Sequence, residues 1–143
     1  MPQDGEASFI YMVGRVNQGI RREMRARLSE CELSVAEYTT LSVLANRPEL
    51  SNAQLARRAL VTPQSMIEIL AQLERRELVQ RAVDPAHGRI LRARLTDKGH
   101  EVLAIATPEV AALNEELFAG VPANQRRAAQ AAMRAAMENL SSS

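Results

Sequence analysis

Side chains that can form hydrogen bonds with base edges occur at helical spacing in one segment of the chain. The set comprises Thr62, Gln64, Ser65, Glu68 and Gln72, opposite an apolar stripe of Met66, Ile69, Leu70 and Leu73. Glutamine can form two hydrogen bonds with adenine, and glutamate can accept one from the amino group of cytosine. This pattern predicts a helix face that contacts duplex DNA. A polar face that meets only solvent is the alternative.

Basic side chains concentrate in and after this helix. Residues 57–98 contain nine Lys and Arg against five Asp and Glu, whereas the rest of the chain contains nine against twelve. The basic residues around the following turn are Arg81, His87, Arg89, Arg92 and Arg94. Because guanidinium groups bind phosphates and enter narrow minor grooves, we expect Arg89 to enter a groove and the flanking arginines to meet phosphates. Ordinary solubility is the alternative role for exposed arginines.

Other chemistry is poorly supported by the sequence. The chain has one cysteine and two histidines, and it lacks a phosphate-binding loop, a nucleophile elbow and spaced metal ligands. We therefore expect no enzyme activity, no metal and no cofactor. The four aromatic residues all lie outside the basic segment, which argues against binding of single strands or RNA by stacking.

The cellular compartment is indicated by cysteine content and hydropathy. A single cysteine, Cys31, cannot form an intrachain disulfide, which favours a reducing cytoplasm. No apolar run is long enough to span a membrane, and the N-terminal residues do not resemble a signal peptide. We expect a cytoplasmic protein that does not enter a membrane.

Helix start signals divide the chain into its expected elements. The stretches Ser34–Glu37 and Ser51–Gln54 match the capping box, in which a serine and a Glu or Gln three residues later bond each other's backbone. Thr62 caps the next helix, with Pro63 at its first position, and Thr96 caps a later one. The sequence therefore predicts short helices that begin near residues 35, 52 and 63.

A β-hairpin is expected after the helix that begins at Pro63. Residues 79–83 and 92–96 alternate with period two around a tip at 84–89 that contains Asp84 and Gly88. Two helices joined by a tight turn and followed by a hairpin form a winged helix-turn-helix. We assign residues 34–96 to such a DNA-binding lobe within a single domain, 1–143, that is mainly α with a small β-wing and six helices.

The outer helices carry more apolar surface than a domain of this size needs. Residues 7–31 have one apolar stripe, which comprises Phe9, Val13, Val16, Ile20, Met24 and Leu28. Residues 97–140 contain two more striped helices, separated by Gly120 and Pro122, and Pro108 is expected to kink the first of them. We interpret 7–31 and 97–140 as dimerisation helices. A monomer with a satellite helical bundle is the alternative.

These elements and motifs together resemble the MarR family of bacterial regulators over nearly the whole chain. The matching stretches are NAQLARRALVTPQSM, LERRELVQRAVDP, the arginine at 89 and LTDKG at 95–99 as the end of the wing. The resemblance implies a homodimeric winged-helix repressor or activator that binds a palindromic operator in duplex DNA, and of the two we expect a repressor. It also implies release by a small aromatic or phenolic ligand.

Three positions depart from the family pattern. Glu68 stands near a place where members often carry arginine, so a different base preference is expected. His87 and Gly88 precede Arg89 where the wing commonly has a more basic tip. Glu77 stands where glycine commonly ends the recognition helix. Because a left-handed cap costs a non-glycine residue about 1 kcal/mol, we expect this helix to end differently.

The ligand site and the alternatives rest on few residues. The resemblance places the ligand between the dimer helices and the DNA-binding lobe, where Tyr11, Arg15 and Tyr38 could supply a phenol and a cation. Both tyrosines could instead belong to the core. The alternative functions are a redox-responsive regulator acting through Cys31, whose acidic neighbours do not favour a reactive thiolate, and a helical interaction module without DNA binding.

Overall fold

The computed structural model describes residues 8–84, 86, 88 and 91–141. Within these residues the elements are α1 (Phe9–Leu28), a 3₁₀ turn (Ser29–Cys31), α2 (Val35–Asn46), α3 (Asn52–Arg58), α4 (Pro63–Arg75), β1 (Val79–Val83), β2 (Leu91–Leu95), α5 (Asp97–Leu117) and α6 (Ala123–Ser141). The expected winged helix-turn-helix with six helices is confirmed. The backbone separates into two compact units, Met1–Val110 and Ala111–Ser143, whose boundary lies within α5.

The predicted helix starts are confirmed in detail. At α2 the backbone N–H of Glu37 donates to the Ser34 hydroxyl (3.0 Å), and the Ser34 N–H donates to the Glu37 carboxylate (2.9 Å). Ser51 and Gln54 form the same reciprocal pair at α3. Thr62 caps α4 by accepting from the Ser65 N–H at 3.0 Å. Each cap satisfies backbone donors that have no partner within the helix, so these starts are encoded locally.

Three helical segments end at non-glycine residues in the left-handed conformation. Glu32, Leu60 and Glu77 have φ angles of 55°, 60° and 60°. At the end of α4, the Leu78 N–H donates to the Leu73 carbonyl and the Glu77 N–H to that of Glu74, both at 2.9 Å. This is the Schellman arrangement. Our expectation that Glu77 would make α4 end differently is therefore wrong, because the cap's two hydrogen bonds hold Glu77 in the left-handed region.

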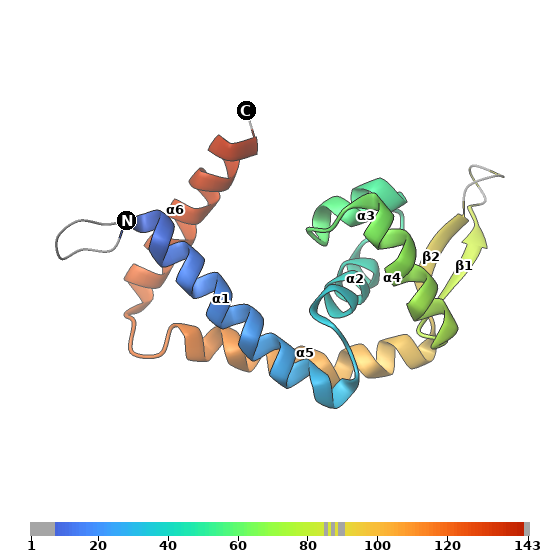
Figure 1. The fold of residues 1–143 in the computed structure, drawn as a ribbon, viewed down its shortest axis with the longest axis horizontal. Helices are drawn as coiled ribbons and strands as arrows, with labels where there is room; N and C mark the ends of the chain where they lie inside the picture. The colour runs from blue at the N-terminus through green and yellow to red at the C-terminus, as the bar shows by residue number, and fades with distance from the viewer. Residues whose placement is uncertain (1–7, 85, 87, 89–90, 142–143) are drawn as a thin grey trace. The chain divides into compact units, whose positions relative to one another are not determined.

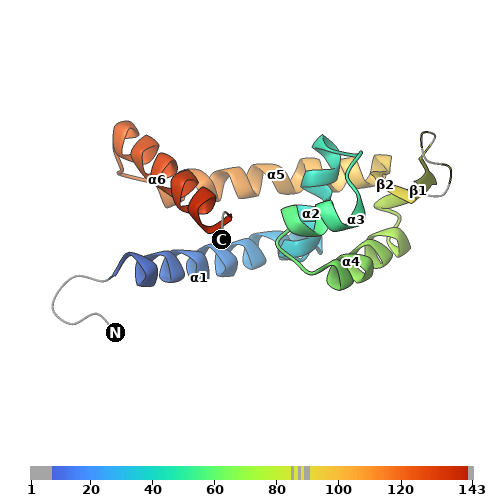
Figure 2. The ribbon, with the colours of Figure 1, turned by 90° about the horizontal axis from the view of Figure 1, so that it is seen from above.

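The core of the first unit lies where α1, α2, α3, α4 and the base of the hairpin meet. Its fully buried large side chains include Leu28, Leu41, Leu55, Met66, Leu73 and Leu78. Figure 1 shows α2, α3, α4 and the two strands gathered into one lobe, and Figure 2 shows α4 on one side of α2 and the start of α5 on the other. One side of α4 is therefore fixed in the core and its opposite side faces outward.

The hairpin is joined to α5 by a close approach of backbones. The Thr96 N–H donates to the Leu78 carbonyl at 3.1 Å, and the Thr96 hydroxyl donates to the Glu77 carbonyl. Gly99 then packs directly on Leu78, where an added Cβ would lie well inside 3.0 Å of the Leu78 carbonyl oxygen. The Leu-Thr-x-x-Gly motif thus ties the base of the wing to the end of α4, and only glycine fits its last position.

The second unit holds the corner between α5 and α6. Arg126 donates two hydrogen bonds to the Glu115 carboxylate, both at 3.1 Å, and its guanidinium lies 5.0 Å from the Phe118 ring centroid. Gly120 turns the chain with a φ of 79°. Pro108 lies inside α5, which continues as one helix through it. The bend that we expect at Pro108 stays a prediction.

Candidate nucleic-acid interface

The recognition helix candidate, α4, presents most of the predicted polar residues outward. Gln64, Glu68 and Gln72 are exposed, whereas Met66, Leu70 and Leu73 on the other side are buried. Thr62 is exposed at the N-cap, and its hydroxyl donates to that of Ser65 (3.0 Å). Ser65 is half-buried. The N-terminal turns of α4 can therefore offer side-chain amide, carboxylate and hydroxyl groups to a base edge.

An ion pair fixes the far end of α4 to the start of α2. Arg76 donates to the Glu37 carboxylate at 3.2 Å, and both side chains are partly buried, with 32% and 17% of their surfaces exposed. The same carboxylate completes the capping box at Ser34. These groups line a shallow groove with Ser65, Glu68 and Gln72. Three of the predicted residues thus share the side of α4 that faces α2.

The wing arginines divide between the two faces of the hairpin. Antiparallel pairing sets Arg81 opposite Ala93 and Gln80 opposite Arg94, and neighbouring residues in a strand point to opposite faces. Arg81 therefore shares the face of Val79, which is buried, and pairs with Glu74 of α4 at 3.1 Å. It lies between the wing and α4.

Arg92 and Arg94 occupy the other face of the hairpin. Arg92 donates to the Asp84 carboxylate at 3.2 Å, with 17% and 21% of these side chains exposed, and Asp84 also accepts from the Ala86 N–H. Arg94 is exposed and lines a shallow groove with Pro48 and Glu49. Arg92 therefore stabilises the start of the turn, and Arg94 is the more accessible cation of the two.

The predicted tip residues cannot be placed. His87 and Arg89 lie outside the described residues. Of the ten predicted DNA-contacting residues, the structure thus places eight, at α4 and on the two faces of the wing.

One carboxylate lowers the positive charge near Arg94. The hydrogen bond that Arg47 donates to Glu49 holds the pKa of that carboxyl below its ordinary value. With this lowered pKa, Glu49 is ionised at neutral pH. It lines the same groove as Arg92 and Arg94. A phosphate that approaches Arg94 therefore also meets a negative charge from the loop between α2 and α3.

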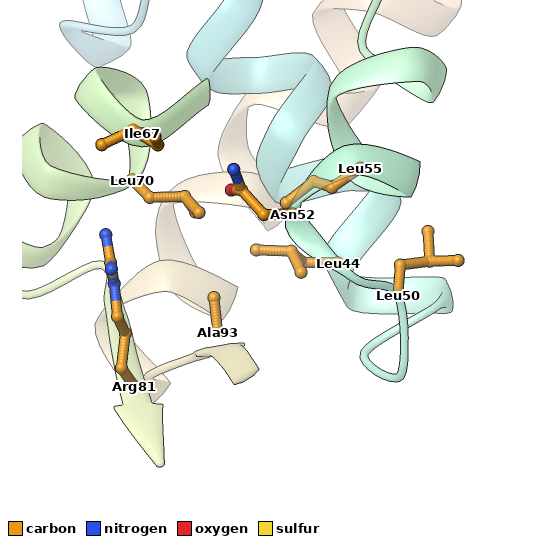
Figure 3. Close-up of a pocket in the computed structure, with 8 residues that line it drawn as sticks. All are labelled: Leu44, Leu50, Asn52, Leu55, Ile67, Leu70, Arg81 and Ala93. Carbon is orange, nitrogen blue, oxygen red and sulfur yellow. The ribbon is translucent and has the colours of Figure 1, made fainter. Parts of the chain in front are cut away.

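Ile67 is an exposed apolar residue of α4 that the polar and basic sequence patterns do not include. It lines a pocket of about 200 Å³ with Leu70, and Figure 3 shows Arg81 extending from β1 toward α4 on the same side of the pocket. Leu44, Asn52 and Leu55 form the other side. The sequence contains a signal for this residue, because Ile67 is an apolar side chain three residues after Gln64 on an otherwise polar helix face.

The three predicted ligand residues are not brought together. The Arg15 guanidinium donates to the Tyr11 hydroxyl at 2.9 Å and lies 5.8 Å from its ring centroid, and Tyr11 is exposed on α1. Tyr38 instead belongs to the core of the lobe, with 8% of its surface exposed. Cys31 is half-buried against the same core. Tyr11 and Arg15 form a pair, whereas Tyr38 has a packing role.

Metal ligands and apolar helices bear on other classes of function. In the part of the chain that the structure describes, no three His, Cys, Asp or Glu residues gather in a way that could hold a metal ion. Over the same residues, no helix combines the length and hydropathy that a membrane span requires.

A helix pair with an outward polar face, joined to a hairpin that carries arginines on both faces, defines the winged helix-turn-helix class of proteins. A sequence profile described as MarR family matches residues 32–90. The HTH-type transcriptional repressor Rv2887 of Mycobacterium tuberculosis is 37% identical over 122 residues, which cover 85% of this chain and 88% of that protein. The chain belongs to the MarR family.

Solved structures agree with this assignment. The structure of Mycobacterium tuberculosis Rv2887 in complex with salicylic acid superposes with a TM-score of 0.73 at 35% identity, over 90% of this chain and 96% of that one. The complex of the same protein with DNA gives a TM-score of 0.73 at 33% identity, over 90% and 97%. The resemblance of the sequence to the MarR family is thus confirmed.

Proposed function

We propose that this protein is a transcriptional repressor that binds a palindromic operator in duplex DNA as a homodimer. The observation that carries the proposal is the arrangement of α4, which is anchored in the core by Met66, Leu70 and Leu73 and exposes Gln64 and Glu68. A rigid helix with polar N-terminal turns fits the major groove. The DNA complex of the relative Rv2887 supports the same use of this fold.

Uncovered apolar surface supports the homodimer. In α1, Phe9, Val13 and Val16 are exposed by 55%, 39% and 48%, although their spacing makes one stripe. In the second unit, α6 has no buried residue among those described, and its Met137 and Leu140 are exposed. Because such contiguous apolar stripes are costly in water, we propose that α1, α5 and α6 of two copies cover one another.

The proposed DNA contacts fall into two groups. Thr62, Gln64, Ser65, Glu68 and Gln72 would contact bases and nearby phosphates from α4, and Arg81, His87, Arg89, Arg92 and Arg94 would serve the wing. The ion pairs of Arg81 and Arg92 support a part in positioning the wing, whereas exposed Arg94 is suited to a direct phosphate contact. For Arg89 we keep the proposed contact with the minor groove.

A small aromatic acid is the proposed effector. The relative Rv2887 has been solved with salicylic acid, and this chain offers an exposed pair of a phenol and a guanidinium at Tyr11 and Arg15. A guanidinium binds a carboxylate strongly. Because Tyr38 is buried in the core of the lobe, its proposed part in the ligand site is to pack beneath it without contacting the ligand.

The remaining assignments follow from the proposed role. The chain's curated relatives are transcriptional regulators, and we propose that this chain likewise has no enzymatic activity. A regulator of this kind must reach the chromosome, so we assign it to the bacterial cytoplasm.

The function is tested by fluorescence anisotropy on duplexes from the intergenic regions beside the gene. We expect specific binding whose affinity falls steeply with salt, by about 0.9 log units per log unit of salt for each phosphate neutralised. Gln64→Ala should lower the preference for the operator, and Arg94→Ala should reduce the salt slope by about 1. Gln18→Ala, an exposed glutamine on the side of α1 opposite its apolar stripe, is the matched control.

Two results would contradict the proposal. Binding that is weak, nonspecific and insensitive to Gln64→Ala would favour an interaction module. The second result is release from the operator by an oxidant but not by salicylate. If Cys31→Ser abolished that release, the redox alternative would replace the proposed effector.

A further inference from the structure

Ile67 interrupts the polar face of α4 at a position that faces outward. It follows Gln64 by three residues, so the two side chains are neighbours on the helix surface, and Glu68, four residues after Gln64, lies on the other side of that glutamine. About half of its surface, 49%, is exposed. Its β-branched side chain has few rotamers in a helix. Ile67 is thus a rigid hydrocarbon beside Gln64, a side chain that can bind a base edge.

A hydrocarbon can recognise one feature of the major groove. Each base pair presents donors and acceptors there, and thymine adds a C5 methyl group. We propose that Ile67 contacts the C5 methyl of a thymine in each half-site, which makes thymine at that position a determinant of the operator. This inference rests on the proposed function, because it names a base that the proposed recognition helix selects.

Other occupants of this surface are less well supported. The pocket beside Ile67 has a volume of about 200 Å³, below the roughly 300–1,000 Å³ of small-molecule sites. The surface for a second copy is provided by the exposed stripes of α1 and α6. The positive excess of residues 57–98 instead favours a polyanion. These observations together favour duplex DNA as the molecule that covers Ile67.

The experiment couples a protein methyl deletion with a DNA methyl deletion. Operator sequences are first selected from a random duplex pool with the full-length protein. Each thymine of the selected half-site is then replaced by deoxyuridine, which removes only the C5 methyl, and dissociation constants are measured for the unmodified protein and for Ile67→Ala. Leu60→Ala is the matched control, because Leu60 is an exposed apolar residue of the same lobe, 86% exposed, that lies outside α4.

We expect one thymine at which deoxyuridine weakens binding by about fourfold per half-site, the effect of one buried methyl group. That loss should vanish in Ile67→Ala and persist in Leu60→Ala. Equal deoxyuridine effects in all three proteins, or none in any, would overturn the inference while the selected operator upholds the proposed function. A pool without enrichment would overturn both. If Ile67→Ala folds poorly, Ile67→Val, which keeps the β-branch, replaces it. We expect the deoxyuridine effect in Ile67→Val to be smaller than in the unmodified protein.

Discussion

Glu77 ends α4 in a backbone conformation that favours glycine. Its φ of 60° costs a residue with a Cβ about 1–2 kcal/mol, partly offset because glycine loses more entropy on folding. Glu77→Gly should therefore raise the free energy of unfolding by about 0.5–1 kcal/mol. The measurement is the denaturant midpoint at a fixed protein concentration, since dimerisation shifts it.

The matched control for this substitution is Glu77→Ala, which removes the same charge but keeps the Cβ. Leu60, with the same φ, should respond to glycine in the same way. If Glu77→Ala gained as much stability as Glu77→Gly, the charge and not the left-handed backbone would be the source.

Gly99 shows the opposite requirement, for space. A methyl group there would overlap the Leu78 carbonyl oxygen, which also accepts the Thr96 N–H. Gly99→Ala should therefore destabilise the protein by about 1–3 kcal/mol. In contrast, Gly14→Ala adds a Cβ that meets nothing within 4 Å in α1, and it should gain up to about 1 kcal/mol. Thermal unfolding of both variants compares them, and a neutral Gly99→Ala would show that the wing and α5 can separate without cost.

At the scale of elements, the corner between α5 and α6 depends on an ion pair. The hydrogen bonds from Arg126, and then its charge, hold the pKa of Glu115 below its ordinary value. The unfolded chain therefore binds a proton at Glu115 at a higher pH than the folded chain does. The stabilisation is fully present above the ordinary carboxyl pKa of about 4.3 and is lost as the pH falls through the lowered folded value.

This pH dependence can be measured against Glu115→Gln, which cannot titrate. We expect the unmodified protein to be the more stable at neutral pH and the difference to shrink as the pH drops below about 4.3. Glu101→Gln, on the same helix, is the control. A stability difference that stays constant down to low pH would remove the ion pair from this role.

The position of α4 is also set by contacts between elements. Its start is capped by Thr62, its inner side is packed in the core, and its last turn is held to α2 by the pair of Arg76 and Glu37. A helix fixed at both ends presents its exposed side chains at defined positions. We therefore assign the selectivity for bases to the residues of α4 and general affinity to the arginines of the wing.

At the scale of the whole molecule, the unpaired apolar stripe of α1 predicts the assembly state. Val16 lies on that stripe and is 48% exposed in the single chain. Val16→Glu would bury a carboxylate in the proposed interface, which is costly without a partner. Sedimentation should show the unmodified protein as a dimer at micromolar concentration and Val16→Glu as a 15.8 kDa species with retained helicity and weakened operator binding.

Gln18→Glu introduces a similar carboxylate on the other side of α1 and should remain dimeric. A dimer that survives Val16→Glu unchanged would move the interface away from this stripe, and a monomeric unmodified protein would contradict the dimer altogether.

The order and the starts of the elements could be predicted from the amino-acid sequence. The capping pairs Ser34–Glu37 and Ser51–Gln54 join residues three apart, and the strands follow from period-two alternation. Such signals are local, so they do not depend on the rest of the chain. The MarR resemblance likewise came from contiguous motifs.

The pairing of polar groups, in contrast, depends on the folded arrangement of the chain. Arg81 turns toward Glu74 and Arg92 toward Asp84 because the pairing register places them on opposite faces of the wing. Tyr38 is buried while Tyr11 remains exposed, and Gly99 touches Leu78 across 21 residues. These outcomes depend on packing between segments distant in sequence, which no local pattern specifies.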